Sequence, residues 1–209
     1  MEIIKALNWR YATKSFDKDK MVTKEKLNIL IEAFNLTATS YGLQPIKLLV
    51  ISNKELQDSL VKHSMGQKQV AQASHVLVFC IETTIDKIYI DKYFELVKAI
   101  RNTPDEILDP FKNFLIADFE NKSKKEINEW STKQAYIALG NLLTVCSIER
   151  IDACPMEGFD SNMYDEILDL KSKDLQSVLV LPIGYRAVDD YMAQLDKVRK
   201  ELIESVITV

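Results

Sequence analysis

Two basic side chains near the N-terminus, Arg10 and Lys14, have the types and the spacing that suit an anion-binding site. They follow a segment, residues 3–7, whose apolar side chains recur as they do on a helix. If that helix continued through both residues, the two side chains would point the same way. A guanidinium binds phosphate as a fork and an ammonium binds it as a point charge, so the pair suits a phosphate group. A pair of solvated surface charges explains the same spacing, and on spacing alone it is the commoner case.

The composition limits the class of protein. With 209 residues, of which 47% are hydrophobic and 28% charged, the chain is expected to form one domain over residues 1–209. The net charge of −4 argues against general binding to nucleic acids or anionic membranes. No apolar run approaches the roughly 18 residues of a membrane span. An anion site in this acidic chain must therefore be local.

The cysteines and histidines restrict the possible chemistry. Cys80, Cys146 and Cys154 are odd in number, widely spaced and set among apolar neighbours, which predicts buried free thiols in a reducing cytoplasm. The N-terminal residues also lack the layout of a secretory signal, so a cytoplasmic location is expected. His63 and His75 are the only histidines, and no metal-ligand spacing occurs. A metal centre and a histidine-based triad are therefore not expected.

The apolar pattern predicts the main elements. A short helix is expected after the cap residue Asn53, and the order of the elements favours an α+β fold with helices on both sides of one sheet. Residues 135–145 are apolar almost all the way round, which is typical of a helix at a subunit interface and predicts a homodimer. The longer helices are predicted at residues 24–36 and 125–148, and a small helix is predicted around 161–168. The strands are predicted at 46–51, 76–81, 151–154 and 177–183.

Residues 86–122 are interpreted as an excursion from this core. They are helical in pattern but more polar, with breaks expected near residues 103–104 and again near Pro110. An excursion between a core strand and the longest helix suggests a lid or channel wall. Its aromatic residues are more often packing residues than gates, and the candidates for a gate are Phe111, Phe114 and Phe119.

Because metal, triad and glycine-rich phosphate motifs are all missing, an enzyme built on this sequence would need an organic cofactor with its own reactivity. The C-terminal tail, residues 189–209, carries two further cations, Lys197 and Arg199. These could join Arg10 and Lys14 around one phosphate, or they could be solvated charges on the tail.

A series of short motifs, in this order and at these separations, carries a family resemblance. Each motif is weak alone, but together they extend over nearly the whole chain. They are residues 10–17, 39–45, 66–70, 73–75, 129–130, 133–134, 140–141, 155–160 and 197–199. On these residues the chain resembles the FMN-dependent nitroreductase family, in its branch of oxygen-insensitive NAD(P)H nitroreductases and dihydropteridine reductases.

The resemblance implies a fold and a reaction. The implied fold has three layers, with a central mixed, mostly antiparallel sheet flanked by helices, in an intertwined homodimer that exchanges its C-terminal tails. The implied activity is that of an FMN-dependent NAD(P)H oxidoreductase. Hydride would pass through flavin N5 in a ping-pong cycle to a nitroaromatic, quinone or pterin-type acceptor.

The resemblance also implies the roles of individual residues. Arg10, Lys197 and Arg199 would hold the FMN phosphate, with the backbone of Tyr11 and Ala12 beside it. Lys14 would lie at the N1/O2 edge of the ring, where its charge stabilises the anion that develops during reduction. Glu157 is implied to act at flavin N5 and O4 through its main chain rather than as a general acid. The remaining implied contacts are Thr39, Ser40 and Tyr41 from the second subunit, Gly66, Gln67 and Gln69 at the polar edge of the ring, and Pro155, Met156 and Gly158 on one flavin face.

Three positions depart from the pattern of the family. Ala12 stands where many relatives have Ser, Gly66 where they often have Asn, and Gln69 where some have Lys. The phosphate cations are untouched, so the departures concern the electronics of the flavin. Two alternatives stay open: a flavin-binding or flavin-delivering protein without efficient turnover, and a dehalogenase or flavin-fragmenting relative. In the second case a substrate-gripping cluster would be expected in residues 86–122, and none is evident.

Overall fold

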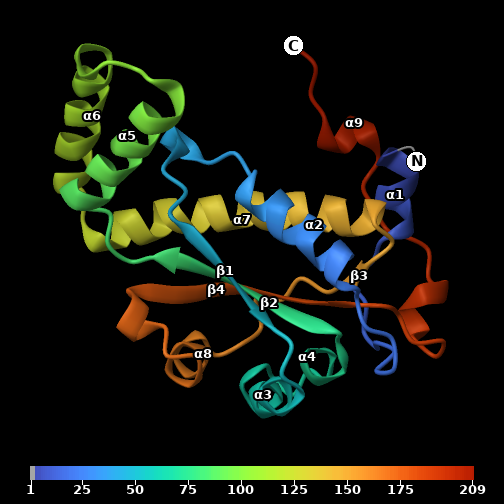
Figure 1. The fold of residues 1–209 in the computed structure, drawn as a ribbon. Helices are drawn as coiled ribbons and strands as arrows, with labels where there is room; N and C mark the ends of the chain where they lie inside the picture. Colours follow the sequence, from blue (N-terminus) through green and yellow to red (C-terminus); the bar gives the residue numbers. More distant parts are fainter. Residues whose placement is uncertain (1–2) are drawn as a thin grey trace.

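The computed structural model describes residues 3–209 and places a four-stranded sheet between two layers of helices (Figure 1). Every pairing within the sheet is antiparallel, and an isolated bridge between Ala12 and Ala153 adds one parallel contact at its edge. The α+β prediction is therefore confirmed. The strands follow the order β1 (Ile46–Ile51), β2 (His75–Glu82), β4 (Leu175–Gly184) and β3 (Asp152–Ala153).

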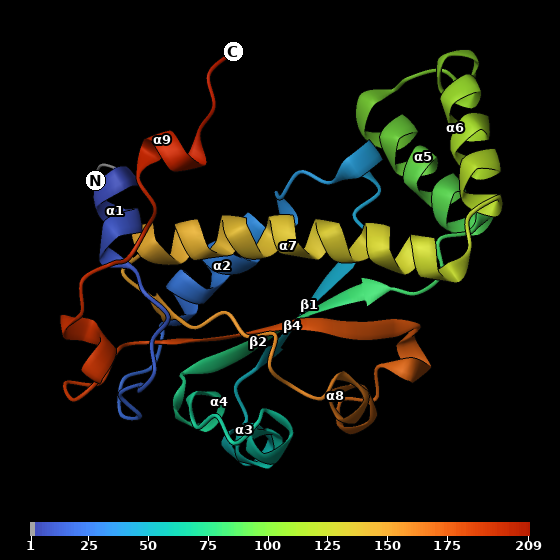
Figure 2. The ribbon, with the colours of Figure 1, turned by 180° about the vertical axis from the view of Figure 1, so that it is seen from behind.

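The helices divide between the two faces of the sheet, as Figures 1 and 2 show from opposite sides. One face is covered by α2 (Lys24–Asn35) and by the long helix α7 (Lys124–Ile148). The other face is covered by α3 (Lys54–Leu60), α4 (Gln69–Gln72) and α8 (Ser161–Ile167). Because β2 is packed on both sides, its side chains from Val76 to Cys80 are fully buried, as its continuous apolar run predicts.

Local signals explain where several helices begin. The side chain of Thr23 caps α2, Asn53 caps α3, and Ser123 with Glu126 forms a capping box at the start of α7. These boundaries agree with the sequence prediction to within one or two residues, while β3 is shorter than predicted.

The excursion consists of two helices, α5 (Lys87–Arg101) and α6 (Asp105–Glu120), set at one end of the molecule. The predicted break between them is confirmed, since Asn102 ends α5 in the left-handed conformation with φ of 51°. The second break, predicted near Pro110, is wrong because Pro110 lies inside a continuous α6. Leu115 and Phe119, one to two turns further on, are buried in a shared apolar cluster with α5, and this packing keeps the helix continuous despite the missing N–H donor.

The N-terminal helix α1 (Ile3–Trp9) ends before Arg10. The hypothesis that Arg10 and Lys14 share a helix face is therefore wrong. The chain beyond Trp9 is drawn instead along the edge of the sheet, where Ala12 bridges Ala153 and the N–H of Thr13 donates to the carbonyl of Ala153 at 3.4 Å.

The C-terminal tail passes beside α1 and then leaves the body of the protein (Figures 1 and 2). Before it departs it forms a short turn of 3-10 helix, η4 (Tyr191–Gln194), and further out the short helix α9 (Leu202–Ser205). Residues 206–209 have β-prone side chains but form no strand within this chain. Apolar residues of the tail are strongly exposed, among them Leu202, Ile203 and Ile207.

Candidate functional site

Three cations from the two ends of the chain converge at one place. The ammonium of Lys197 donates a hydrogen bond to the carbonyl of Arg10, 187 residues earlier. Partial burial and then the charge of Arg199 lower the pKa of Arg10. Burial, followed by the charges of Arg10 and Arg199, lowers the pKa of Lys197. Arg10 and Lys197, each with a lowered pKa beside Arg199, therefore form with it a site that an anion would stabilise.

Lys14 and Gln69 lie near the same place as Arg10, because all three act on the thiol of Cys154. Burial raises the pKa of the Cys154 thiol, and the charge of Lys14, a hydrogen bond from Gln69 and the charge of Arg10 oppose that shift. Burial also raises the pKa of Cys146 to about 12, against the charge of Arg10. The cysteines are free and buried as predicted. Two buried thiols thus lie near the cations, and their raised pKa values keep both of them in the neutral form.

A buried carboxylate, Asp190, fixes the segment that carries these cations. Its Oδ2 accepts hydrogen bonds from the N–H of Lys14 at 2.8 Å, the N–H of Ser15 at 3.1 Å and the hydroxyl of Tyr11 at 3.1 Å. Its Oδ1 accepts from the N–H of Met192 at 3.0 Å. Burial alone would raise the pKa of Asp190, but these donors outweigh it and the pKa is lowered. The sequence analysis missed this residue, whose only signal was its position as an acid at the start of a basic tail.

Replacing Asp190 with Asn should destabilise the folded protein, because an amide cannot accept from all four donors. We expect a loss of about 1–3 kcal/mol in the free energy of unfolding, the cost of leaving buried donors unpaired. Since folding lowers the pKa of this carboxyl, its stabilisation is complete above the unfolded pKa of about 4 and is lost as the pH falls through the folded value. Denaturant titrations between pH 7 and pH 3 measure both effects. A variant as stable as the parent at pH 7 would contradict this role.

The predicted turn at residues 155–158 lies along β4 and against the loop before α4. The N–H of Met156 donates to the carbonyl of Val180 at 2.8 Å, and the N–H of Val180 returns a bond of 3.0 Å. The side chain of Gln67 donates to the carbonyl of Gly158 at 3.1 Å. A Cβ atom on Gly158 would lie 3.1 Å from the sulfur of Met65, whose side chain is exposed. Gln67 and the turn, which the sequence separates by about ninety positions, are thus neighbours in the structure.

Two predicted contact residues have their groups engaged within the chain. Gly66 adopts the left-handed conformation with φ of 71°, which suits glycine, and its N–H donates to the carbonyl of Val61. The carboxylate of Glu157 accepts a hydrogen bond of 2.8 Å from the hydroxyl of Tyr136 on α7. That bond raises the pKa of Tyr136 and occupies the side chain of Glu157, which agrees with a main-chain role for this residue.

The loop with Thr39, Ser40 and Tyr41 does not join the cations within one chain. The N–H of Ser40 donates to Oε1 of Gln134 at 2.8 Å, and Tyr41 packs on Trp130 with ring centroids 6.2 Å apart. Gln134 precedes Cys146 by three turns of α7, about 18 Å at 1.5 Å per residue. A role for this loop in a site with Arg10 therefore requires a second copy of the chain.

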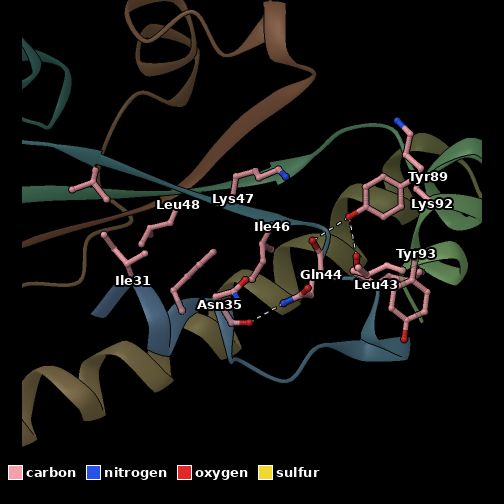
Figure 3. Close-up of a pocket in the computed structure, with 13 residues that line it drawn as sticks. Ile31, Asn35, Leu43, Gln44, Ile46, Lys47, Leu48, Tyr89, Lys92 and Tyr93 are labelled. Carbon is pink, nitrogen blue, oxygen red and sulfur yellow. Dashed lines mark hydrogen bonds between the residues drawn. The ribbon is translucent and has the colours of Figure 1, made fainter. Parts of the chain in front are cut away.

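A groove of about 600 Å³ lies at the open edge of β1, between α2 and α5 (Figure 3). Tyr89 closes one end, where its hydroxyl donates to the carbonyls of Leu43 at 2.8 Å and Gln44 at 3.1 Å. The side chain of Gln44 donates to the carbonyl of Asn35 at 2.8 Å. The groove is apolar along Ile31 and Leu48, and it lies at the opposite edge of the sheet from β3 and the cations.

Within residues 3–209, no cluster of three or more His, Cys, Asp or Glu side chains could hold a metal ion. In the same part of the chain, none of the helices combines the length and the apolar character that crossing a bilayer requires.

The fold and the site define a class of α+β proteins in which cations from both ends of the chain converge beside one edge of the sheet. Residues 7–185 match the model of the nitroreductase family, and the chain belongs to this family. It is 31% identical to the oxygen-insensitive NAD(P)H nitroreductase of Enterobacter cloacae, with 97% of each chain covered. The ydfN protein of Bacillus subtilis has the same fold, with a TM-score of 0.88 at 20% identity and coverage of 99% and 98%. A protein from Exiguobacterium sibiricum, crystallised in complex with FMN, gives a TM-score of 0.84 at 19% identity and coverage of 100% and 98%.

These comparisons confirm the family resemblance and the nitroreductase-like fold that the sequence analysis expected. The roles of the individual site residues, the dimer and the tail exchange stay predictions.

Proposed function

We propose that the protein is an FMN-dependent NAD(P)H oxidoreductase that reduces nitroaromatic, quinone or pterin-type acceptors. The observation that carries the proposal is the convergence of Arg10, Lys197 and Arg199. Arg10 and Lys197 are partly buried there and lie close to the charge of the exposed Arg199. The names of the related proteins support the same reductant and cofactor.

The cations fit the phosphate group of FMN. A phosphate monoester carries close to two negative charges at neutral pH, and guanidinium groups pair with its oxygens in a bidentate way. Arg10 and Arg199 supply two such forks and Lys197 supplies a point charge. Arg10, Lys197 and Arg199 would hold FMN by its phosphate, and the bound FMN would supply the redox chemistry between NAD(P)H and the acceptor in a ping-pong cycle.

The other residues would bind and orient the ring. Lys14, fixed through its backbone by Asp190, would set a positive charge against the electron-rich edge of the isoalloxazine. Gly66, Gln67 and Gln69 would approach that polar edge. The turn of Pro155, Met156, Glu157 and Gly158 would line one face and present its backbone N–H groups.

A homodimer would complete the site. Thr39, Ser40 and Tyr41 would enter from the second copy, since within one chain α7 separates them from the cations. Ile137 and Ile148 on α7 are 50% and 40% exposed, which leaves apolar surface for a partner helix. The apolar tail would cross to the partner and lie in the groove at the edge of β1, where the strand has unpaired backbone groups. This arrangement and the sequence composition suggest a cytoplasmic protein.

Deleting residues 201–209 tests the exchange of tails. We expect the truncated protein to dissociate at concentrations where the full chain is dimeric, because each buried apolar side chain of the tail contributes about 1.5–3 kcal/mol. Sedimentation velocity at several concentrations measures the change. Lys197 and Arg199 remain in the truncated chain, so a loss of assembly separates from a loss of cations. An unchanged dimer would show that the tail does not hold the subunits together.

The function itself is tested on the purified protein. We expect a yellow preparation that releases FMN on denaturation and whose visible flavin absorbance bleaches rapidly when NAD(P)H is added without oxygen. Slow bleaching of a tightly bound flavin would favour the alternative, a flavin-binding or flavin-delivering protein. A colourless preparation that does not take up added FMN would refute both.

A further inference from the structure

We propose that Arg186 is a positioning residue for the phosphate site: it holds the two residues on either side of Arg10 and thereby aims the Arg10 guanidinium at the phosphate. The inference rests on the proposed function, because it takes the FMN phosphate as the ligand of Arg10. Arg186 was not among the site residues expected from the sequence.

The guanidinium of Arg186 lies against two aromatic rings at once. Its Cζ is 4.4 Å from the centroid of the Trp9 ring and 4.5 Å from the centroid of the Tyr11 ring. A second guanidinium, that of Arg150, lies 4.8 Å from the Trp9 ring. A cation close to an aromatic face is attracted by the ring quadrupole, more strongly where water is excluded. Trp9 and Tyr11 are therefore tied to one group, and Arg10 is the residue between them.

Arg186 can act as an anchor because it is itself fixed. Its Nε donates to Oδ1 of Asp152 at 2.8 Å, its Nη2 lies 2.6 Å from the same oxygen, and its backbone N–H donates to Oδ2 at 2.8 Å. The side chain of Asp152 is 5% exposed and belongs to β3. Residue 186 also bridges Phe16, so its backbone is tied to the segment that follows Lys14. Removing one partner of such a buried pair is strongly unfavourable, which keeps the guanidinium in place.

Arg10 needs such an anchor. The α-helix ends at Trp9, and the N–H of Arg10 makes its last hydrogen bond of the helical type, to the carbonyl of Ala6 at 3.2 Å. The backbone after Arg10 leaves the helix and follows the edge of the sheet. The side chain of Arg10 is also partly buried beside a like charge, since burial and then the charge of Arg199 lower its pKa. Arg186 carries a positive charge too, but Asp152 compensates it. It therefore holds Arg10 in position without adding a further repelling cation to the site.

The test compares two ligands that differ only by the phosphate. Dissociation constants for FMN and for riboflavin are measured by flavin fluorescence on the full-length protein stripped of flavin. For Arg186→Met we expect the constant for FMN to rise about tenfold, the equivalent of one weakened charge-assisted contact, while that for riboflavin stays within about twofold. The matched control is Arg150→Met, which removes the exposed guanidinium from Trp9, and there both constants should stay within about twofold.

Two outcomes overturn the inference: an unchanged affinity for FMN in folded Arg186→Met, or an equal loss for FMN and riboflavin, which would indicate a general structural role. If Arg186→Met does not fold, Trp9→Leu replaces it, because this change leaves the ion pair with Asp152 intact. It should show the same loss confined to FMN, and a normal FMN affinity there overturns the inference as well. A parent protein that binds no FMN at all would instead refute the proposed function.

Discussion

Replacing both Arg10 and Arg199 with Ala is expected to weaken FMN binding by about 3–6 kcal/mol, since charge-assisted hydrogen bonds contribute about 1.5–3 kcal/mol each. The change removes two of the three cations that converge beside α1 and leaves only Lys197. Isothermal titration of the flavin-free protein with FMN measures the loss. Lys200→Ala is the matched control, because Lys200 is exposed and lies next to Arg199 in sequence.

Without ligand, the same double variant should be at least as stable as the parent protein. Because the charge of Arg199 lowers the pKa of Arg10, and the charges of both arginines lower the pKa of Lys197, removing the two arginines relieves repulsion. The melting temperature of the flavin-free protein should therefore not fall. Inorganic phosphate should raise the melting temperature of the parent protein but not that of the variant, since only the parent would retain the anion site. Unchanged FMN affinity would mean that the phosphate is held elsewhere.

Replacing Lys14 with Met should slow flavin reduction by about a hundredfold while FMN stays bound, the scale seen when one preorganised electrostatic group is removed from a reacting centre. The backbone of Lys14 is held by Asp190, and this contact does not depend on its side chain, so the fold should be kept. The measurement is the rate at which visible flavin absorbance disappears after anaerobic mixing with NAD(P)H. Lys18→Met, at a nearby exposed position, is the control. A normal rate in the Lys14 variant would exclude this side chain from the mechanism.

Periodicity was sufficient to predict most of the fold. The buried run in β2, the caps at Thr23 and Asn53 and the long apolar α7 are local signals, and each has its expected consequence in the structure. The wrong predictions lie where distant contacts decide the local conformation. Pro110 stays helical because Leu115 and Phe119 are packed against α5, and this packing cannot be deduced from residues 105–120 alone.

The residues of the candidate site divide in the same way, into those that the sequence was sufficient to select and those that depend on distant contacts. Residue types and the family resemblance were sufficient to select Arg10, Lys197 and Arg199, and the structure brings them together. Asp190 and the pair of Arg186 with Asp152 were missed, because most of their partners lie 34 to 179 positions away along the chain. None of the three residues belongs to a short motif, so only the folded structure shows what each one holds.

The cluster of cations joins residue 10 to residues 197 and 199, and this has a consequence for how the protein is made. A ribosome adds Lys197 and Arg199 only after all four strands have been synthesised, because β4 ends at Gly184. A nascent chain that has passed Gly184 but not reached Lys197 therefore contains every strand of the sheet and lacks two of the three cations. Termination between these two residues would yield a chain with all four strands and an incomplete anion site.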